Sequence, residues 1–330
     1  MADITATDAP AAALPVQEET RGTRRLHRGI MIGIAIALVI APFVAYPVFV
    51  MKVLCFALFA LAFNLLLGYG GLLSFGHAAY FGMASYVSAY VAKQWGLTPE
   101  LAILSGTLIA AALGFVFGSL AIRRQGIYFA MITLALAQMV YFFSLQTPRF
   151  TGGEDGIQAV PRGRLLGLID LSDDRVLYWL VAAVFMGGLL LIYRIIHSPF
   201  GQICKAIRDN EPRAISLGYR VNQYKLAVFV LSASLAGLAG ATKAMVFQLA
   251  SLTDVHWSMS GEVVLMTLVG GLGTVFGPIA GAIVIVAMQN YLATLGAWVT
   301  VVQGVIFVIC VMTFREGIVG VISKWIKKPL

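Results

Sequence analysis

Long apolar stretches alternate with short polar or glycine-rich connections along most of the chain. Segments such as 29–50 and 180–196 are apolar on every face, which argues against the alternating strands of a membrane β-barrel. A membrane-spanning helix needs about 20 such residues. Hydropathy and helix-breaking residues together predict ten membrane helices. They are expected near 29–50, 53–68, 72–92, 98–121, 126–146, 176–196, 225–249, 260–272, 277–294 and 298–314.

Two of the predicted boundaries consist of little more than glycine. The run 68–71 divides the second and third helices, and the run 270–274, with Pro278, divides the eighth and ninth. Either pair could instead be one broken or re-entrant helix. We therefore predict an all-α, polytopic membrane domain over 29–314, with about ten transmembrane helices and broken or re-entrant Gly-rich segments.

The two glycine-rich breaks resemble each other. Residues 70–76 read GGLLSFG, and residues 270–277 read GGLGTVFG, which is one residue longer. Glycine interruptions in two halves of a membrane chain point to transporter repeats with a site near the membrane midplane.

Composition excludes most other classes of protein. The chain is 60% hydrophobic and 12% charged, with a mean hydropathy of +0.89, far from a soluble domain. The net charge is +8, but the basic residues lie between apolar runs rather than among exposed aromatic residues. They therefore indicate membrane topology and not nucleic-acid binding. Neither a P-loop nor a catalytic or metal-binding motif occurs. We expect no catalytic residue, no metal site and no bound cofactor on this chain.

The positions of the basic residues predict the orientation in the membrane. With ten helices both termini share one side, and that side receives 16 of the 23 Lys and Arg residues against six on the other, with Lys243 inside a helix. The positive-inside rule places both termini in the cytoplasm. Residues 1–28 are then a disordered cytoplasmic tail, 147–175 an outer loop, 197–224 a cytoplasmic segment and 315–330 a cytoplasmic C-terminal tail.

The first glycine-rich break is a candidate for a translocation path. Glycines there permit backbone breaks and close helix approach, and freed carbonyls, Ser74 and His77 could face a water-filled path. The alternative is simple helix packing, with His77 hydrogen-bonded to a neighbouring carbonyl. The candidate path residues are Gly68, Gly70, Gly71, Ser74, Phe75, Gly76 and His77, together with the acidic residue Glu262.

Few ionisable residues lie within the predicted helices, and such residues are functional candidates because they are costly in a membrane. Lys243 and Glu262 lie near the predicted outer face and could pair across a turn that holds Asp254 and His256. Lys243 could equally extend to the membrane interface. The short side chain of Glu262 favours a role inside the bundle.

The cytoplasmic segment 197–224 has a helical apolar pattern. Apolar residues recur over 203–207 and again over 214–217, Pro212 separates the two groups, and Gly218 follows as a C-cap. This pattern predicts two short amphipathic helices that dock into the groove of a partner. The alternative is a solvated loop whose basic residues only set the topology.

Three segments resemble the LivM-type permease subunits of bacterial branched-chain amino acid ABC importers, the LivH/LivM group. They are 64–86, with LSFGHAAYFG; 198–238, with AIRDNE, AISLG and LAGLAG; and 261–282, with EVVLM and GGLGTVFGP. The resemblance implies a bacterial inner (cytoplasmic) membrane protein that pairs with a second, LivH-like permease, two cytoplasmic ATP-binding subunits and a periplasmic substrate-binding protein. ATP and Mg would bind to the partner subunits and not to this chain.

The resemblance also assigns roles to the cytoplasmic segment. Glu211, Ala214 and Gly218 look like the family's version of the E-A-A…G segment that couples a permease to its ATPase, although no Leu-Pro follows here. The candidate coupling residues are Lys205, Arg208, Asp209, Asn210, Glu211, Arg213, Ala214 and Gly218. Branched-chain or other hydrophobic amino acids are the expected substrates. Urea, short amides or aromatic acids on the same scaffold are the alternatives, and an ion-coupled secondary transporter is the competing class.

Overall fold

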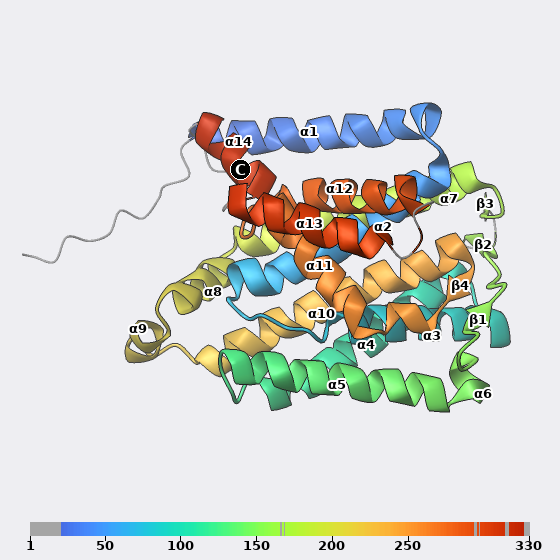
Figure 1. Ribbon diagram of the computed structural model, residues 1–330, viewed down its shortest axis with the longest axis horizontal. Coiled ribbons are helices and arrows are strands. Elements are labelled where there is room, and N and C mark those ends of the chain that lie inside the picture. The colour runs from blue at the N-terminus through green and yellow to red at the C-terminus, as the bar shows by residue number, and fades with distance from the viewer. Residues whose placement is uncertain are drawn as a thin grey trace, which may run out of the picture.

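A computed structural model describes residues 21–165, 167, 169–293, 296, 298–313 and 317–326. This part of the chain forms an elongated bundle of helices, with very short strands at one end (Figure 1). The helices are α1 (Arg21–Val44), α2 (Pro47–Asn64), α3 (His77–Gln94), α4 (Pro99–Ala121), α5 (Ile127–Gln146), α6 (Pro148–Thr151), α7 (Asp174–Ile196), α8 (Pro199–Asp209), α9 (Glu211–Ser216), α10 (Val221–Phe247), α11 (Trp257–Gly270), α12 (Gly277–Tyr291), α13 (Trp298–Thr313) and α14 (Gly317–Ile326). A π-helix, η1 (Leu65–Tyr69), extends α2, and a 3₁₀ helix, η2 (Leu252–Asp254), precedes α11. The strands are β1 (Ile157–Gln158), β2 (Arg164–Leu165), β3 (Ile169–Asp170) and β4 (Leu249–Ala250).

Proline and glycine set many of the helix ends. Proline occupies the first turn of α2, α4, α8 and α12, where its missing N–H leaves no hydrogen bond unmade. Between α9 and α10, Gly218 adopts φ +86°, which an L side chain rarely tolerates. Its N–H donates to the carbonyl of Ile215 (2.9 Å), and the N–H of Tyr219 donates to that of Ala214 (3.2 Å). This is a Schellman motif, so the predicted C-cap at Gly218 is confirmed.

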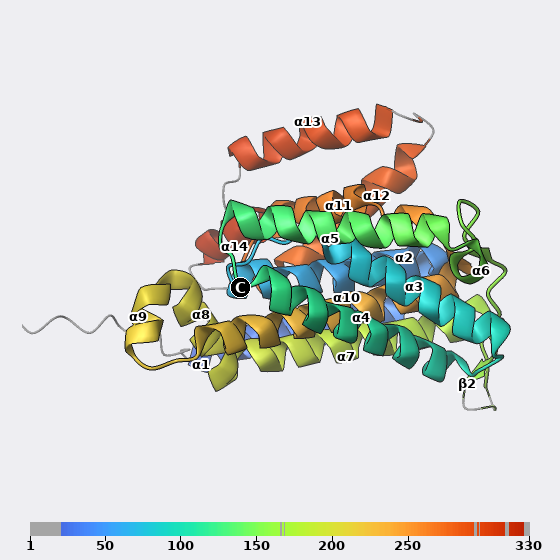
Figure 2. The ribbon, with the colours of Figure 1, turned by 90° about the horizontal axis from the view of Figure 1, so that it is seen from below.

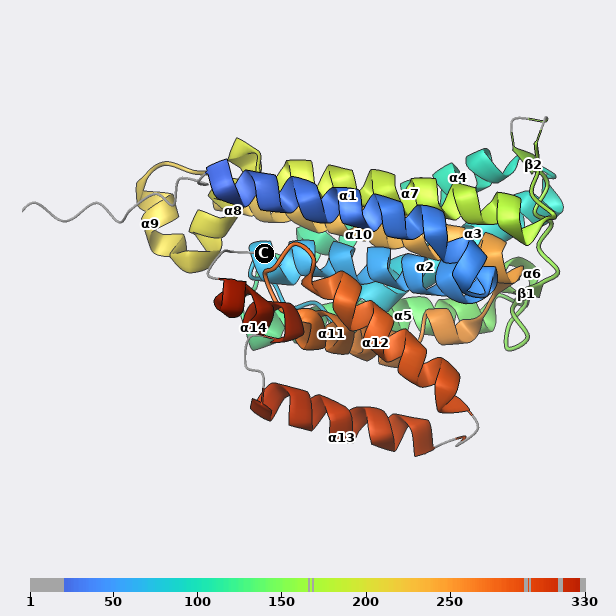
Figure 3. The ribbon, with the colours of Figure 1, turned by 90° about the horizontal axis from the view of Figure 1, so that it is seen from above.

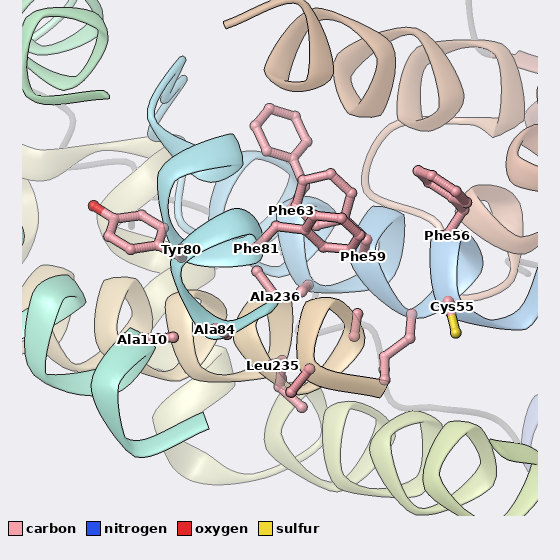
Figure 4. Packing of buried hydrophobic residues seen from close by; sticks show 14 of the residues in the cluster. Cys55, Phe56, Phe59, Phe63, Tyr80, Phe81, Ala84, Ala110, Leu235 and Ala236 are labelled. Atoms are coloured by element: carbon pink, nitrogen blue, oxygen red, sulfur yellow. The ribbon is translucent and has the colours of Figure 1, made fainter. Parts of the chain in front are cut away.

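The centre of the bundle is formed by α2, α3, α4 and α10. Phe59 of α2 packs on Phe81 of α3 with ring centroids 4.5 Å apart (Figure 4). On the other side of α3, small residues let the helices approach closely: a Cβ added at Gly237 of α10 would lie only 2.2 Å from the Cβ of Ala110 on α4. Close packing of small residues is a usual way to hold membrane helices together.

The remaining long helices flank this centre. Helices α1 and α7 lie along one side, and α11 and α12 lie along another (Figure 3). Helix α13 lies to one side of the bundle, near α11 and α12 (Figures 2 and 3). Exposed apolar residues on α1, α5 and α13 therefore form the outer surface that a membrane or a partner would cover.

The two ends of the bundle differ. Helices α8, α9 and α14 and the start of α1 lie at one end, on the left of Figure 1, whereas α6 and the strands lie at the opposite end. There β1 pairs antiparallel with β4, with Ile157 opposite Ala250, so the segment after α5 is attached to the segment after α10. A second short pair, β2 with β3, also lies in this loop.

The structure agrees with much of the predicted architecture and changes its details. Each of the ten predicted segments contains a helix, and six helices among the described residues are long and apolar enough to cross a membrane: Leu26–Val44, Pro47–Tyr69, Pro99–Ala121, Ile127–Gln146, Asp174–Ile196 and Val221–Phe247. The chain is therefore a polytopic helical membrane protein.

Several predicted boundaries were wrong. The first helix already begins at Arg21 and ends at Val44, before Pro47, because proline starts the next helix. The third helix begins at His77 and not at 72, because residues 71–76 are not helical. Helix α14 lies within 315–330, which was predicted only as a tail. Residues 1–20 of the predicted N-terminal tail lie outside the described residues.

Candidate functional site

The two glycine-rich breaks lie against each other in the folded chain. A Cβ added at Gly68 would lie 2.8 Å from the backbone nitrogen of Gly273, so only glycine permits this approach. Asn64, the last residue of α2, holds the two segments together. Its Oδ1 accepts from the N–H of Gly273 (2.9 Å), and its Nδ2 donates to the carbonyl of Thr274 (2.8 Å).

The breaks also share local structure. The hydroxyl of Ser74 accepts from the N–H of Gly76 (3.2 Å), and the hydroxyl of Thr274 accepts from the N–H of Gly277 (3.0 Å). The backbone angles just before the next helix are similar, with φ −95° and ψ 0° at Gly76 and φ −103° and ψ −9° at Phe276. The sequence similarity of the two breaks thus corresponds to a similar turn before α3 and before α12.

The predicted coupling segment contacts the first break. The guanidinium of Arg208, on α8, donates to the carbonyl of Gly68 in the π-helix. A Cβ added at Gly71, where φ is +69°, would lie 2.6 Å from Cγ of Arg208. The ammonium of Lys205 lies 5.2 Å from the ring centroid of Tyr69, which is a cation–π contact. Two residue sets that were predicted separately therefore meet in one place.

The coupling segment consists of two short helices, α8 and α9, as the apolar spacing predicted. The Ser198 hydroxyl accepts from the N–H of Gly201 at the start of α8, and the Asn210 amide oxygen accepts from that of Arg213 at the start of α9. Such side-chain caps satisfy N–H groups that a helix leaves unpaired. Asn210 was predicted to contact a partner, and here it also stabilises α9.

Glu211 fixes α9 to two other elements. One carboxylate oxygen accepts from Nζ of Lys225 on α10 (2.7 Å), and the other accepts from Nε2 of Gln125 in the α4–α5 turn (2.9 Å). The Lys225 side chain is only 8% exposed, so this ion pair is largely shielded from water. Displacement of α9 would therefore pull directly on α10 and on the start of α5.

One surface of the coupling segment is packed and another is free. Ala214 is buried with Ile207 and Val221, and buried Cys204 lies in α8. Burial raises the pKa of the Cys204 thiol to about 11, so the thiol is protonated at neutral pH and packs as an apolar side chain. The exposed residues include apolar ones around the end of α9 and polar ones predicted to couple. These are Ile215, Leu217, Tyr219, Asp209 and Arg213.

An apolar pocket of about 510 Å³ lies between the first break and α5. The N–H of Phe75 donates to the hydroxyl of Thr133 (3.1 Å), which fixes the non-helical segment against α5. No side chain that lines the pocket is charged. The lining residues are Gly71, Leu72, Leu73, Phe75, Gly126, Ile127, Phe129, Ala130, Met131 and Leu134.

Ser74 and His77 lie inside the bundle. His77 is fully buried, and its Nε2 lies 2.8 Å from the hydroxyl of Ser232 on α10. Its ring packs edge-on against those of Phe63 and Tyr80. In this conformation His77 contacts other side chains of the bundle and does not line the pocket. This arrangement is close to the packing alternative, except that the partner is a hydroxyl and not a carbonyl.

Lys243 and Glu262 do not pair with each other, and that part of the prediction was wrong. Nζ of Lys243 binds both carboxylate oxygens of Asp254 (2.6 and 2.8 Å), and Glu262 accepts from Nε2 of Gln289 on α12 (3.0 Å). The reason is local: the 3₁₀ helix η2 places Asp254 against α10, so the carboxylate of Asp254, and not that of Glu262, binds the Lys243 ammonium. Glu262 lies eight residues before Gly270, about 12 Å along α11 from the break.

The Lys243–Asp254 pair yields a stability prediction. Both side chains are under 10% exposed, so Lys243→Met leaves a buried carboxylate without its partner and should destabilise the chain by about 3–5 kcal/mol. A thermal melt in detergent measures the loss. The double variant Lys243→Met with Asp254→Leu removes both charges and should recover much of it. Equal losses in the single and double variants would contradict this account.

The structure identifies three functional candidates that were missed. Asn64 joins the breaks, and Gln125 and Lys225 hold Glu211. A polar amide at the end of the apolar run 53–63 is a signal that could have identified Asn64. No comparable signal exists for Gln125, because its contact depends on how two distant turns meet.

The comparisons with known proteins agree with this architecture. Residues 46–311 match the family model described as the branched-chain amino acid transport system permease component. The chain is 26% identical over 294 residues to the high-affinity branched-chain amino acid transport permease LivM of Escherichia coli, covering 82% of this chain and 69% of that one. It is 27% identical over 238 residues to the ribose import permease RbsC of Bacillus subtilis, covering 67% of this chain and 70% of that one. No solved structure matches the chain.

The family match covers most of the chain, including both glycine-rich breaks and the whole coupling segment. Together with the six apolar helices it places the chain in the inner membrane as a multi-pass transport subunit and not an enzyme. The resemblance to LivM-type permeases is thereby confirmed. The chain belongs to the permease component family of branched-chain amino acid transport systems and is a permease subunit of an ABC importer.

Proposed function

We propose that this chain and a second, LivH-like permease form the membrane path of an importer for branched-chain amino acids. A periplasmic binding protein delivers the substrate, and two cytoplasmic subunits bind ATP and Mg and drive the cycle. The proposed topology has ten crossings with both termini in the cytoplasm. The position of α8, α9 and α14 and the start of α1 at one end of the bundle supports it, as does the distribution of Lys and Arg.

The observation that carries the proposal is the contact between the coupling segment and the first break. Arg208 of α8 binds the carbonyl of Gly68, and the non-helical segment that follows lines the apolar pocket. Non-helical backbone at membrane depth is tolerated where it lines a cavity or is buried in protein. Movement of α8 by an ATPase would therefore act directly on the wall of the path.

The docking surface for the ATPase is the free side of α9. Ile215, Leu217 and Tyr219 are exposed there by 58%, 69% and 41%. They are apolar and lie at the end of the bundle assigned to the cytoplasm, so lipid tails do not cover them. An apolar helix end of this kind fits a groove of a partner protein.

The pocket favours a substrate with an apolar side chain over sugars, urea and short amides. Leucine, isoleucine and valine present a branched hydrocarbon side chain, and the pocket presents only apolar side chains and backbone. A sugar, as in the ribose import relative, or urea or a short amide has no comparable hydrocarbon part to place against this lining. The α-ammonium and α-carboxylate groups of an amino acid need polar partners outside the residues that line the pocket. Glu262, placed on the path from the sequence, lies away from the pocket lining and remains a candidate for another part of the path.

The test begins with the assembled transporter. The tagged chain is purified in mild detergent, its partners are identified by mass spectrometry, and the complex is reconstituted in vesicles with the binding protein. We expect a second permease, two ATP-binding subunits and ATP-dependent uptake of labelled leucine. Unlabelled isoleucine or valine should compete, and ribose, urea and phenylacetate should not. Uptake that survives ATP depletion but stops when the ion gradient collapses would instead indicate a secondary transporter.

A further inference from the structure

Asn64 is a buried polar side chain at the end of an otherwise apolar helix. Every residue from Val53 to Phe63 is apolar and buried, and Asn64 itself is 2% exposed. A buried amide is costly unless both of its ends are hydrogen-bonded. Asn64 was not among the residues expected to line the path or to couple the chain to an ATPase.

Both ends of this amide bind main-chain groups of the second break. The partners, Gly273 N–H and the Thr274 carbonyl, lie 209 and 210 residues further along the chain. Gly273 has φ +74°, and residues 271–276 are not helical, so these groups have no partner from a regular helix. Thr274 in turn binds the first N–H of α12 through its hydroxyl. Asn64 is therefore connected to the start of α12 through one residue.

The same turn of the chain also binds the coupling segment. Gly68 follows Asn64 by four residues, and its carbonyl accepts from Arg208 of α8. The Gly68 backbone lies directly on Gly273, with no space for a side chain between them. A continuous set of contacts thus runs from α8 through η1 to the second break and α12.

We propose that Asn64 is a positioning residue that joins the two glycine breaks into one rigid unit, so that movement of the coupling segment displaces α11 and α12 together with α2. This inference rests on the proposed function, because it assumes that an ATPase moves α8. Arg208 also lies near Gly273, with its Nη1 3.8 Å from a Cβ added there, but its hydrogen bond is to Gly68. The inference adds the hydrogen bonds through which the movement is transmitted to the second break and α12. Without the amide, α8 would still move η1, but the second break would follow incompletely.

The first experiment measures leucine uptake and ATP hydrolysis by the reconstituted importer. In Asn64→Leu, which keeps the side-chain size but removes both hydrogen bonds, we expect about a tenfold drop in leucine transported per ATP hydrolysed. The rate of ATP hydrolysis should stay within about twofold of the wild type, because the coupling segment remains docked. Asn290→Leu, the same substitution at an exposed site on α12, is the control and should behave as the wild type.

A second experiment measures the movement itself. Spin labels are placed at Gln202 on α8 and Ile283 on α12, both exposed, in a variant whose three cysteines are replaced by alanine. A second pair joins Gln202 to Leu97, which is exposed in the connection between α3 and α4. In the wild type, ATP should change the distance from Gln202 to Leu97 but not the distance from Gln202 to Ile283. In Asn64→Leu, the Gln202–Ile283 distribution should broaden when ATP is added.

The outcomes separate this inference from the proposed function. If ATP changes neither distance in a wild-type complex that hydrolyses ATP and imports leucine, α8 is not the moving element and this inference fails. If the wild-type complex shows no ATP-dependent leucine uptake, the proposed function itself is wrong. If the Gln202–Ile283 distance changes in a wild type that transports normally, the breaks are not one unit and the inference alone fails. If Asn64→Leu does not assemble, Asn64→Asp, which keeps the acceptor for Gly273, is used instead. We expect about a threefold loss of coupling in that variant, and wild-type coupling there would refute the role of Asn64.

Discussion

Replacing Glu211 with glutamine is expected to lower ATP-driven uptake by the assembled importer about 10- to 100-fold, while the chain still inserts in the membrane. Glutamine keeps the shape of the side chain but removes the charge that Lys225 binds at 2.7 Å. Lys225 is nearly buried, so it is left without a compensating charge, and α9 loses its ion pair with α10. Uptake and ATP hydrolysis in vesicles measure the effect.

The matched control is Glu154→Gln, the same substitution at an exposed residue of the outer loop, which should transport normally. The charge exchange Glu211→Lys with Lys225→Glu should restore part of the uptake, because the pair can form in the opposite sense. Normal uptake by Glu211→Gln would show that the contact between α9 and α10 does not transmit force. A purified complex with full ATP hydrolysis and lost uptake would be the clearest sign of uncoupling.

Replacing Gly68 with leucine is expected to cost about 3 kcal/mol or more of stability and to abolish assembly or transport. The new Cβ would lie 2.8 Å from the Gly273 nitrogen and 2.3 Å from Oδ1 of Asn64. The Gly273 backbone cannot rotate away as a flexible side chain can, so the two breaks must separate. The amount of monodisperse complex and its melting temperature measure the loss.

Gly187→Leu on α7 is the control, because a Cβ there meets nothing within 4 Å. Gly71→Leu and Gly76→Leu should also impair transport, for separate reasons. Gly71 has φ +69° and lies against Arg208, and a Cβ at Gly76 would lie 2.9 Å from the carbonyl oxygen of Thr133. Wild-type behaviour of these variants would mean that the first break only fills space.

Local features were predictable from the sequence because they depend on near neighbours in the chain. Apolar runs, prolines at helix starts and the glycine at 218 identified most helices and the two-helix form of the coupling segment. The glycine runs at 68–71 and 270–274 marked the two helix breaks for the same reason. The structure adds that a hydroxyl in each break, from Ser74 and from Thr274, accepts from a backbone N–H near the start of the next helix.

Contacts between residues far apart in the sequence were harder to predict, because they depend on how the helices pack. Lys243 pairs with Asp254 and not with Glu262 because a 3₁₀ turn changes the direction of the chain. The spacing of apolar residues in the sequence does not predict that turn. The burial of His77 depends on α10, which supplies Ser232 more than 150 positions later.

The order of apolar, glycine and proline residues predicts the membrane class, the positions of the breaks and the two-helix form of the coupling segment. Glycine and proline determine the local backbone geometry, and apolar residues determine which segments are stable in lipid. The meeting of Arg208 with Gly68 and of Asn64 with Gly273 arises from packing, because each bond joins elements 140 or more residues apart. Those two contacts bring the coupling segment, the first break and the second break together in the folded chain.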